Sequence, residues 1–218
     1  MARQIGLLVK VLSPTGDVKN SPTLIKALND YADTIEPWAI AVADYMLADV
    51  MRRDWSMWKK VGKEMGRELR QEIEYAPTGA VLKELQGEQV KLIKSLPLSA
   101  AERVHELSME ALLSSTRAKQ VAKDILATES VSKAKATLIA RTEVSRVAAN
   151  LKQARAQFAG SHGYIWRTSE DSDVRKSHQG MNGVYVAWNS PPTLDNLKGH
   201  AGCLPNCRCF AEPLFPSS

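Results

Sequence analysis

The stretch HAGCLPNCRC, residues 200–209, contains all three cysteines of the chain and begins with a histidine. Another histidine, His178, lies a short way upstream. Thiolates and imidazoles are the ligands that Zn²⁺ prefers, and a structural zinc site needs four of them. Cys207 and Cys209 are two residues apart, so on an extended strand their side chains point to the same face. The spacing therefore suits two ligands of one ion.

Two other arrangements of the cysteines stay open at this level. A disulfide between Cys207 and Cys209 requires a strained local ring, and any disulfide leaves one of the three cysteines unpaired. Reduced cysteines that pack in a buried turn are the second alternative. We expect a zinc site in which His178, Cys207 and Cys209 are joined by either Cys203 or His200.

The composition allows one domain with an appended arm, or two small domains. The chain has 218 residues, of which 44% are hydrophobic and 24% charged, and these fractions are typical of soluble proteins. Its net charge of +5 is compatible with a polyanionic neighbour but does not demonstrate one. No apolar run approaches the roughly 18 residues that span a bilayer, and no small-residue cleavage site follows the apolar start. We expect no membrane partner and maturation in a reducing cytoplasm, which further disfavours disulfides.

The segment 37–75 predicts one long helix, bent at Gly62 or Gly66. It contains no internal proline, and its apolar residues recur at helical spacing. A helix of about 39 residues is about 55–60 Å long, which exceeds the interior of a compact domain. We therefore expect this arm to pack against another polypeptide, with residues 97–213 folding without it. The candidate interface residues are Trp55, Trp58, Met65 and Leu69.

A basic cluster lies on the same predicted helix. Basic side chains on one helix can contact DNA phosphates. A solvated or partner-facing surface is the alternative. The candidate DNA contacts are Arg52, Arg53, Lys59, Lys60 and Lys63.

Proline and glycine divide the rest of the chain. The segment 96–99 predicts a break, after which Ser99 and Glu102 form a capping-box pattern. Helical patterns cover 99–160, and the pattern then changes to strands at 164–168, 183–188 and 207–211. We predict an α+β fold that is mainly helical. It comprises a helical arm (1–96), a second domain (97–213) ending in a small β region (164–211), and a tail (214–218). Because this β region has few large apolar residues, a zinc ion would compensate for its small core.

Several charged residues invite either a catalytic or a structural interpretation. Pairs of arginine and glutamate occur in transferases, and neighbouring aspartates can bind a divalent cation. We favour structural pairing, with Arg141 bound to Asp171 or Asp173 and Glu143 bound to Arg175. The sequence contains no nucleophile-with-base motif, phosphate loop or dinucleotide fingerprint. We therefore expect no enzymatic activity.

Five short motifs in a fixed order resemble the phage Mu F-like minor head proteins, also called phage head morphogenesis proteins. The motifs are IARTE (139–143), WRT (166–168), DVRKSH (173–178), MNG (181–183) and NCRC (206–209). The likeness covers roughly residues 97–213. It implies a protein made in the host bacterial cytoplasm and present in a few copies inside the head, at the portal vertex. It also implies a role in head assembly or DNA packaging and ejection. The implied partners are the portal protein, other capsid proteins and packaged double-stranded DNA.

The chain departs from the family at one position that bears on the metal. Many members carry a Cys-x-x-Cys pair where this chain reads VRKSH (174–178), so a histidine must complete any site here. Two other functions stay open. One is a metal-dependent nuclease or toxin-like enzyme that uses His178, Asp171 and Asp173. The other is a zinc-stapled DNA-binding module, which the absence of a basic cluster around the cysteines disfavours.

Overall fold

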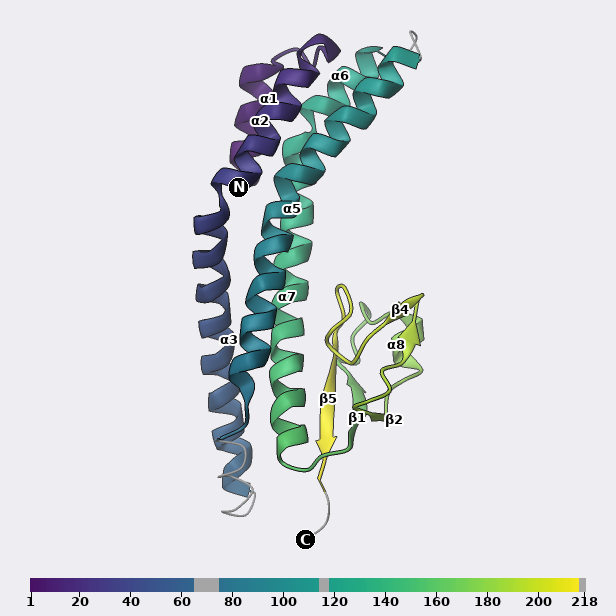
Figure 1. The fold of residues 1–218 in the computed structure, drawn as a ribbon. Coiled ribbons are helices and arrows are strands. Elements are labelled where there is room, and N and C mark those ends of the chain that lie inside the picture. Colours follow the sequence, from purple (N-terminus) through teal and green to yellow (C-terminus); the bar gives the residue numbers. More distant parts are fainter. Residues whose placement is uncertain (65–74, 114–117, 216–218) are drawn as a thin grey trace. The chain divides into compact units, whose positions relative to one another are not determined.

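The chain is mainly helical and ends in a small antiparallel sheet (Figure 1). The computed structural model describes residues 1–64, 75–113 and 118–215. The helices are α1 (Ala2–Leu12), the short η1 (Val18–Asn20), α2 (Ser21–Thr34), α3 (Glu36–Glu64), α5 (Thr78–Leu113), α6 (Ala118–Leu126), α7 (Thr128–Phe158) and α8 (Lys176–Gln179). The strands are β1 (Gly163–Thr168), β2 (Tyr185–Ala187), β3 (Thr193–Leu194), β4 (Leu197–Lys198) and β5 (Cys209–Leu214). The predicted α+β class is confirmed.

The chain forms two compact units. The helical unit comprises Met1–Val42 and Glu88–Ile139, and the mixed unit comprises Ala43–Gly87 and Ala140–Ser218. This division differs from the predicted boundary at residue 96, which falls inside α5. The physical reason is that α3, α5 and α7 are long enough for each to contribute residues to both units.

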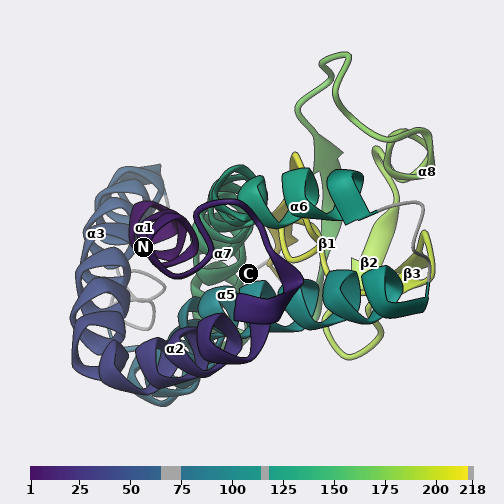
Figure 2. The same cartoon turned by 90° about the horizontal axis from the view of Figure 1, so that it is seen from above.

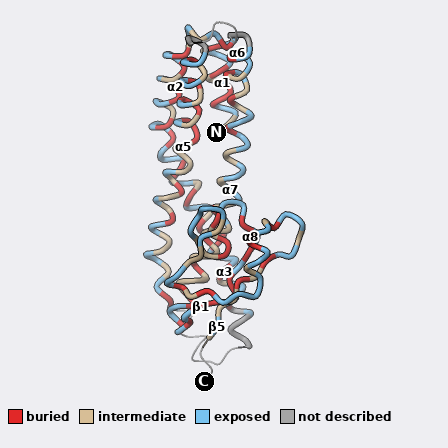
Figure 3. Tube along the Cα trace, turned by 90° about the vertical axis from the view of Figure 1, so that its right-hand side faces the viewer, coloured by how far each residue is buried: buried red, intermediate tan, exposed pale blue. Residues whose placement is uncertain are grey.

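The helical unit is held by one apolar core. Its helices bury residues one turn apart, such as Ile5 and Val9 in α1 and Leu24 and Leu28 in α2, which is the pattern of amphipathic helices. Val104 of α5 and Ile125 of α6 complete the same core. Figure 2 shows α1, α2 and α6 grouped with α5, and Figure 3 shows buried positions following one side of these helices.

The predicted break at residues 96–99 was wrong, because α5 continues through Pro97. A proline inside a helix removes one backbone hydrogen bond and usually kinks or ends the helix. Here the residues around it, Leu96, Ala100, Ala101 and Val104, are buried in the core of the helical unit. Burial of this apolar face outweighs the local preference for a break.

A buried ion pair joins α3 to α7 in the mixed unit. Arg155 Nε donates to Asp54 Oδ2 at 2.8 Å, and Trp58 Nε1 donates to Asp54 Oδ1 at 3.1 Å. The two charged side chains are only 2% and 7% exposed. Burial raises the pKa of Asp54, and the Arg155 guanidinium opposes that rise. Asp54 and Arg155 therefore form a buried ion pair, in which each charge offsets part of the cost of removing the other from water.

These contacts correct the expectation that Trp58 is exposed for a partner. A helix over 36–64 is confirmed, but Trp58 is 5% exposed and packs against Ala159 of the same unit. Trp55 is half-buried, with the Arg155 guanidinium 5.4 Å from its ring centre. Residues 43–64 thus belong to the unit that carries the sheet, and removing residues 1–76 would remove Asp54 and Trp58 from it. The other expected interface residues, Met65 and Leu69, lie outside the described residues, as does Gly66.

The β module, residues 163–214, has an aromatic core of its own. Its main sheet is antiparallel in the order β2-β1-β5, with Trp166 opposite Ala211 and Thr168 opposite Cys209. Tyr164 and Trp166 of β1 are fully buried, and the Trp188 ring centre lies 4.4 Å from that of Tyr164. The region was predicted to have few large apolar residues for a core, and three of its few aromatic residues meet in one cluster.

Within the described residues, no helix has both the length and the apolar content needed to cross a bilayer.

We predict that Asp54→Asn lowers the free energy of unfolding by about 3–5 kcal/mol. The substitution keeps the size of the side chain but removes the charge that pairs with the buried Arg155 guanidinium. Urea denaturation followed by tryptophan fluorescence measures the change.

Asp49→Asn on the same helix is the matched control. Asp49 pairs with Arg52 and Arg53, whose side chains are 76% and 74% exposed, so its loss should cost less than about 1 kcal/mol. Equal losses for the two variants would contradict the role given to the buried pair.

Candidate metal centre

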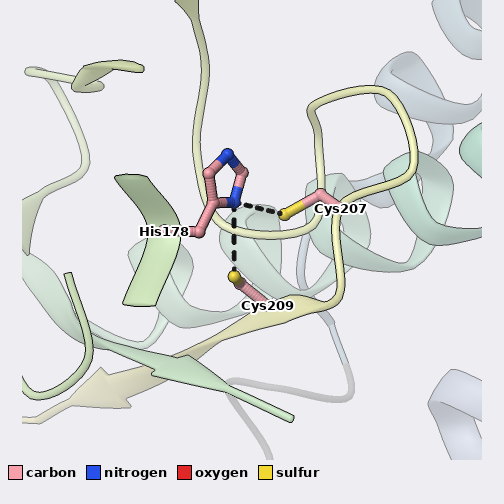
Figure 4. A group of neighbouring side chains, drawn as sticks. All are labelled: His178, Cys207 and Cys209. Atoms are coloured by element: carbon pink, nitrogen blue, oxygen red, sulfur yellow. Dashed lines mark hydrogen bonds between the residues drawn. The ribbon is translucent and has the colours of Figure 1, made fainter. Parts of the chain in front are cut away.

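Three side chains, from α8, from β5 and from the turn that precedes β5, converge in the β module. His178 Nδ1 lies 3.5 Å from Cys207 Sγ and 3.4 Å from Cys209 Sγ (Figure 4). The three donor atoms all lie within 4.8 Å of one another, and the residues are buried. A tetrahedral zinc ion, with Zn–S of about 2.3 Å and Zn–N of about 2.0–2.1 Å, separates such a nitrogen and sulfur by about 3.5–3.6 Å. The donor set and its spacing therefore fit a zinc ion.

Short backbone elements hold the three donors in place. His178 lies on α8, and its ring meets the Trp166 ring edge-on, with centres 5.7 Å apart. Cys209 is the first residue of β5, and the Cys207 backbone N–H donates to Leu204 O at 3.0 Å in the preceding turn. The expected approach of both cysteines from one side is confirmed.

Glycine is required at position 202 of this turn. Gly202 has φ of +87°, and a Cβ atom there would lie 3.2 Å from Ala149 Cβ. Its N–H donates to Cys207 Sγ at 3.4 Å. A side chain at this position would move the N–H that stabilises the Cys207 thiolate.

The thiols of Cys207 and Cys209 are linked by a hydrogen bond, which shifts their pKa values in opposite directions. A hydrogen bond from the Cys209 thiol lowers the pKa of Cys207 to about 5, and the same bond, together with burial, raises the pKa of Cys209. The pair gives up its first proton easily and its second with difficulty. A dication bound between the sulfurs would favour the loss of both.

The structure does not bring Cys203 or His200 into this group. Burial raises the pKa of Cys203 to about 11, which favours the protonated thiol. Both ring nitrogens of His200 are engaged elsewhere: Nδ1 with the Tyr164 hydroxyl at 3.2 Å and Nε2 with Trp188 O at 3.1 Å. Within the described residues, the group has three donors rather than the four expected.

The predicted pairings of the charged residues were wrong. Glu143 is bound by Arg146, at 2.7 Å between Oε2 and Nη2, because the two lie one turn apart on α7. Arg141 is exposed and makes no ion pair among the described residues. Arg175 lies 3.5 Å from Asp195.

Asp171 and Asp173, which were expected to pair with Arg141, pair with Arg208 instead. Arg208 lies between Cys207 and Cys209 in the sequence, and it contacts Asp171 at 2.6 Å and Asp173 at 2.9 Å. Side chains alternate along a strand, so a residue between two inward cysteines points outward. That alternation could have singled out Arg208 from the sequence.

A polar cavity of about 630 Å³ borders the centre on the side of Cys207. The other lining residues are Arg141, Thr142, Ser145, Asp173, Asn206 and Arg208. Asp171 and Asp173 are held by Arg208 and do not belong to the donor group. The expectation of a nuclease site built from His178 and these two aspartates is therefore not met by the geometry.

The candidate DNA contacts on α3 are partly neutralised. Arg52 and Arg53 are exposed, and both pair with Asp49. Lys60 is also exposed. The side chains of Lys59 and Lys63 lie outside the described part of the structure.

Comparison with known proteins gives two matches. The family model described as phage Mu protein F like protein matches residues 102–212, about half of the chain. A protein of Haemophilus influenzae that is described as uncharacterized is 30% identical over 129 residues, which are 59% of this chain and 28% of that protein. The chain thus matches less than a third of that relative's length. No solved structure is a significant match.

We predict that the β module loses stability as the pH falls from about 7 to about 5. Burial lowers the pKa of His200 from its ordinary value of 6.5. Below that value the unfolded chain binds a proton that the folded chain excludes, so the free energy of unfolding decreases as the pH falls. Thermal unfolding of metal-free protein across this range measures the effect.

His200→Gln should make the same pH profile less steep, and Cys207, whose pKa is also lowered in the folded chain, should account for the slope that remains. The variant should also be less stable at pH 7, because the hydrogen bonds to Tyr164 and Trp188 are weakened. A variant with the wild-type slope would show that other groups cause the dependence.

Proposed function

The chain belongs to the phage Mu protein F like family, a family of phage head morphogenesis proteins, and we propose that it is a minor head protein of a tailed bacteriophage. The family match over residues 102–212 carries this proposal. The match includes α7, the β module and all three donors of the candidate metal centre. We further propose that the protein resides in the virion, inside the head at the portal vertex.

In this proposal the protein acts in head assembly and in DNA packaging or ejection. Its partners are the portal protein, other capsid proteins and packaged double-stranded DNA. The exposed Arg52, Arg53 and Lys60 are available for phosphate contacts. The pairing of both arginines with Asp49 makes that contribution modest.

We propose that the metal is zinc and that its role is structural. The ligands would be His178 Nδ1 and the sulfurs of Cys207 and Cys209, with their approach distances as support. A bound zinc ion supplies strong N- and S-ligand bonds that link α8 to the start of β5. Because the aromatic core around Trp166 is already packed, the ion adds stability to a module that has some of its own.

Zinc analysis of reduced protein should give one ion per chain. Cys209→Ser should abolish stoichiometric binding, because it removes one of three donors, and chelation should lower the melting temperature of the wild type. Cys203→Ser is the matched control and should bind one zinc ion. Equal loss of zinc in both variants would show that Cys203 is a ligand and that the three-donor assignment is wrong.

A metal-dependent hydrolase is the second candidate, and the number of donors favours it. Three protein donors leave one zinc position for water, as in catalytic sites, and Cys207 borders a polar cavity. Incubation of plasmid DNA with the zinc-loaded protein, with and without Mg²⁺, tests one form of this activity. Cleavage that disappears in Cys209→Ser would favour the enzyme over the structural role.

The assembly role is tested on purified phage. We expect mass spectrometry of DNA-filled heads to detect this chain at an abundance far below that of the major capsid protein. Coexpression with the portal protein of the same phage should yield a complex that survives gel filtration. Heads that lack the chain, together with free portal rings, would contradict the proposal.

A further inference from the structure

The second ring nitrogen of His178 faces a carboxylate that comes from a different part of the chain. His178 is 1% exposed, and its Nε2 atom has no hydrogen-bond partner among the described residues. Asp195 Oδ2 lies 3.8 Å from this nitrogen. A buried polar nitrogen without a partner is costly, so a carboxylate at this distance needs an explanation.

A tight hairpin puts Asp195 in this position. Strands β3 and β4 pair Leu194 with Leu197, which leaves a loop of two residues. Both loop residues, Asp195 and Asn196, have positive φ, at +52° and +63°. This is the type I′ geometry that suits a two-residue hairpin, and aspartate and asparagine tolerate it better than most residues.

The carboxylate is also held from the His178 side. Ser177 Oγ donates to Asp195 Oδ2 at 3.0 Å, and Arg175 Nε lies 3.5 Å from the same oxygen. These residues belong to the four-residue segment that ends at His178. Asp195 is therefore oriented by the segment that carries the metal-facing histidine.

We propose that Asp195 is the positioning residue of the metal centre, with its carboxylate accepting the Nε2–H of His178. A neutral imidazole carries one proton, and a ligating nitrogen must carry none. A carboxylate at Nε2 keeps the proton there and leaves the Nδ1 lone pair directed at the ion. This role rests on the metal site of the proposed function.

Two variants of Asp195 test the role without disturbing the turn. Asp195→Gly removes the acceptor and tolerates positive φ, and Asp195→Asn keeps the shape but is a weaker, neutral acceptor. Zinc affinity, measured by chelator competition, should fall about 10–100-fold for Asp195→Gly and less for Asp195→Asn. The matched control is Glu212→Gln on β5, which removes a charge that contacts Arg167 rather than His178. It should leave the affinity unchanged.

Long-range ¹H–¹⁵N spectra of the histidine rings provide a second measurement. In zinc-loaded wild-type protein, His178 should be protonated at Nε2 and metal-bound at Nδ1. Unchanged affinity in Asp195→Gly, or zinc bound through Nε2, would overturn the role of Asp195 while the metal site stands. A wild-type chain that binds no zinc would overturn the metal site and the role of Asp195 together.

Discussion

A buried contact between Asp54 and Arg155 joins residues before the family-matched region to the region itself. Both side chains are largely shielded from water, so their charges depend on contacts within the protein. Asp54 also accepts the indole N–H of Trp58, which packs against Ala159 at the end of α7. The C-terminal half of α3 thus provides the packing and the counter-charge for the end of α7, the helix that leads into β1. A definition of the functional domain from the matched residues alone would omit one side of its packing.

The β module combines two kinds of stabilisation. Tyr164, Trp166 and Trp188 provide an apolar core, and the three donors converge beside it from α8 and the start of β5. The aromatic core also packs against one of the donors, because the Trp166 ring meets the His178 ring edge-on. If the module also packs in this way without metal, it presents a preformed donor set, which lowers the ordering cost of binding.

Much of this organisation follows from local sequence rules, and the failures have particular causes. The helix over 36–64, the glycine end of α7 and the convergence of Cys207 and Cys209 are read from periodicity and spacing. The helix break predicted at Pro97 is absent, because burial of Leu96 and Val104 in the core outweighs the tendency of proline to end a helix. The prediction of Cys203 as a possible fourth ligand failed, because closeness in sequence does not reveal the direction in which the turn at Leu204 points each thiol. The role of Asp195 depends on contact across 17 residues, which no local pattern carries, although its turn with Asn196 lies between two leucines.

In the proposed zinc site, a histidine stands where the family resemblance implies a cysteine pair, and this changes what the site needs from its surroundings. A site with four thiolates carries a net charge of about −2 around zinc, whereas one with two thiolates and a neutral imidazole is about neutral. A thiolate binds through its single sulfur atom, but an imidazole offers two nitrogens and two tautomers, of which one is productive. A histidine ligand therefore gains from a fixed acceptor on its far side. In this chain the β3–β4 hairpin places a carboxylate there, held by Ser177 and Arg175. The hairpin places Leu194 against the core, and its two-residue loop makes physical sense as the support of that acceptor.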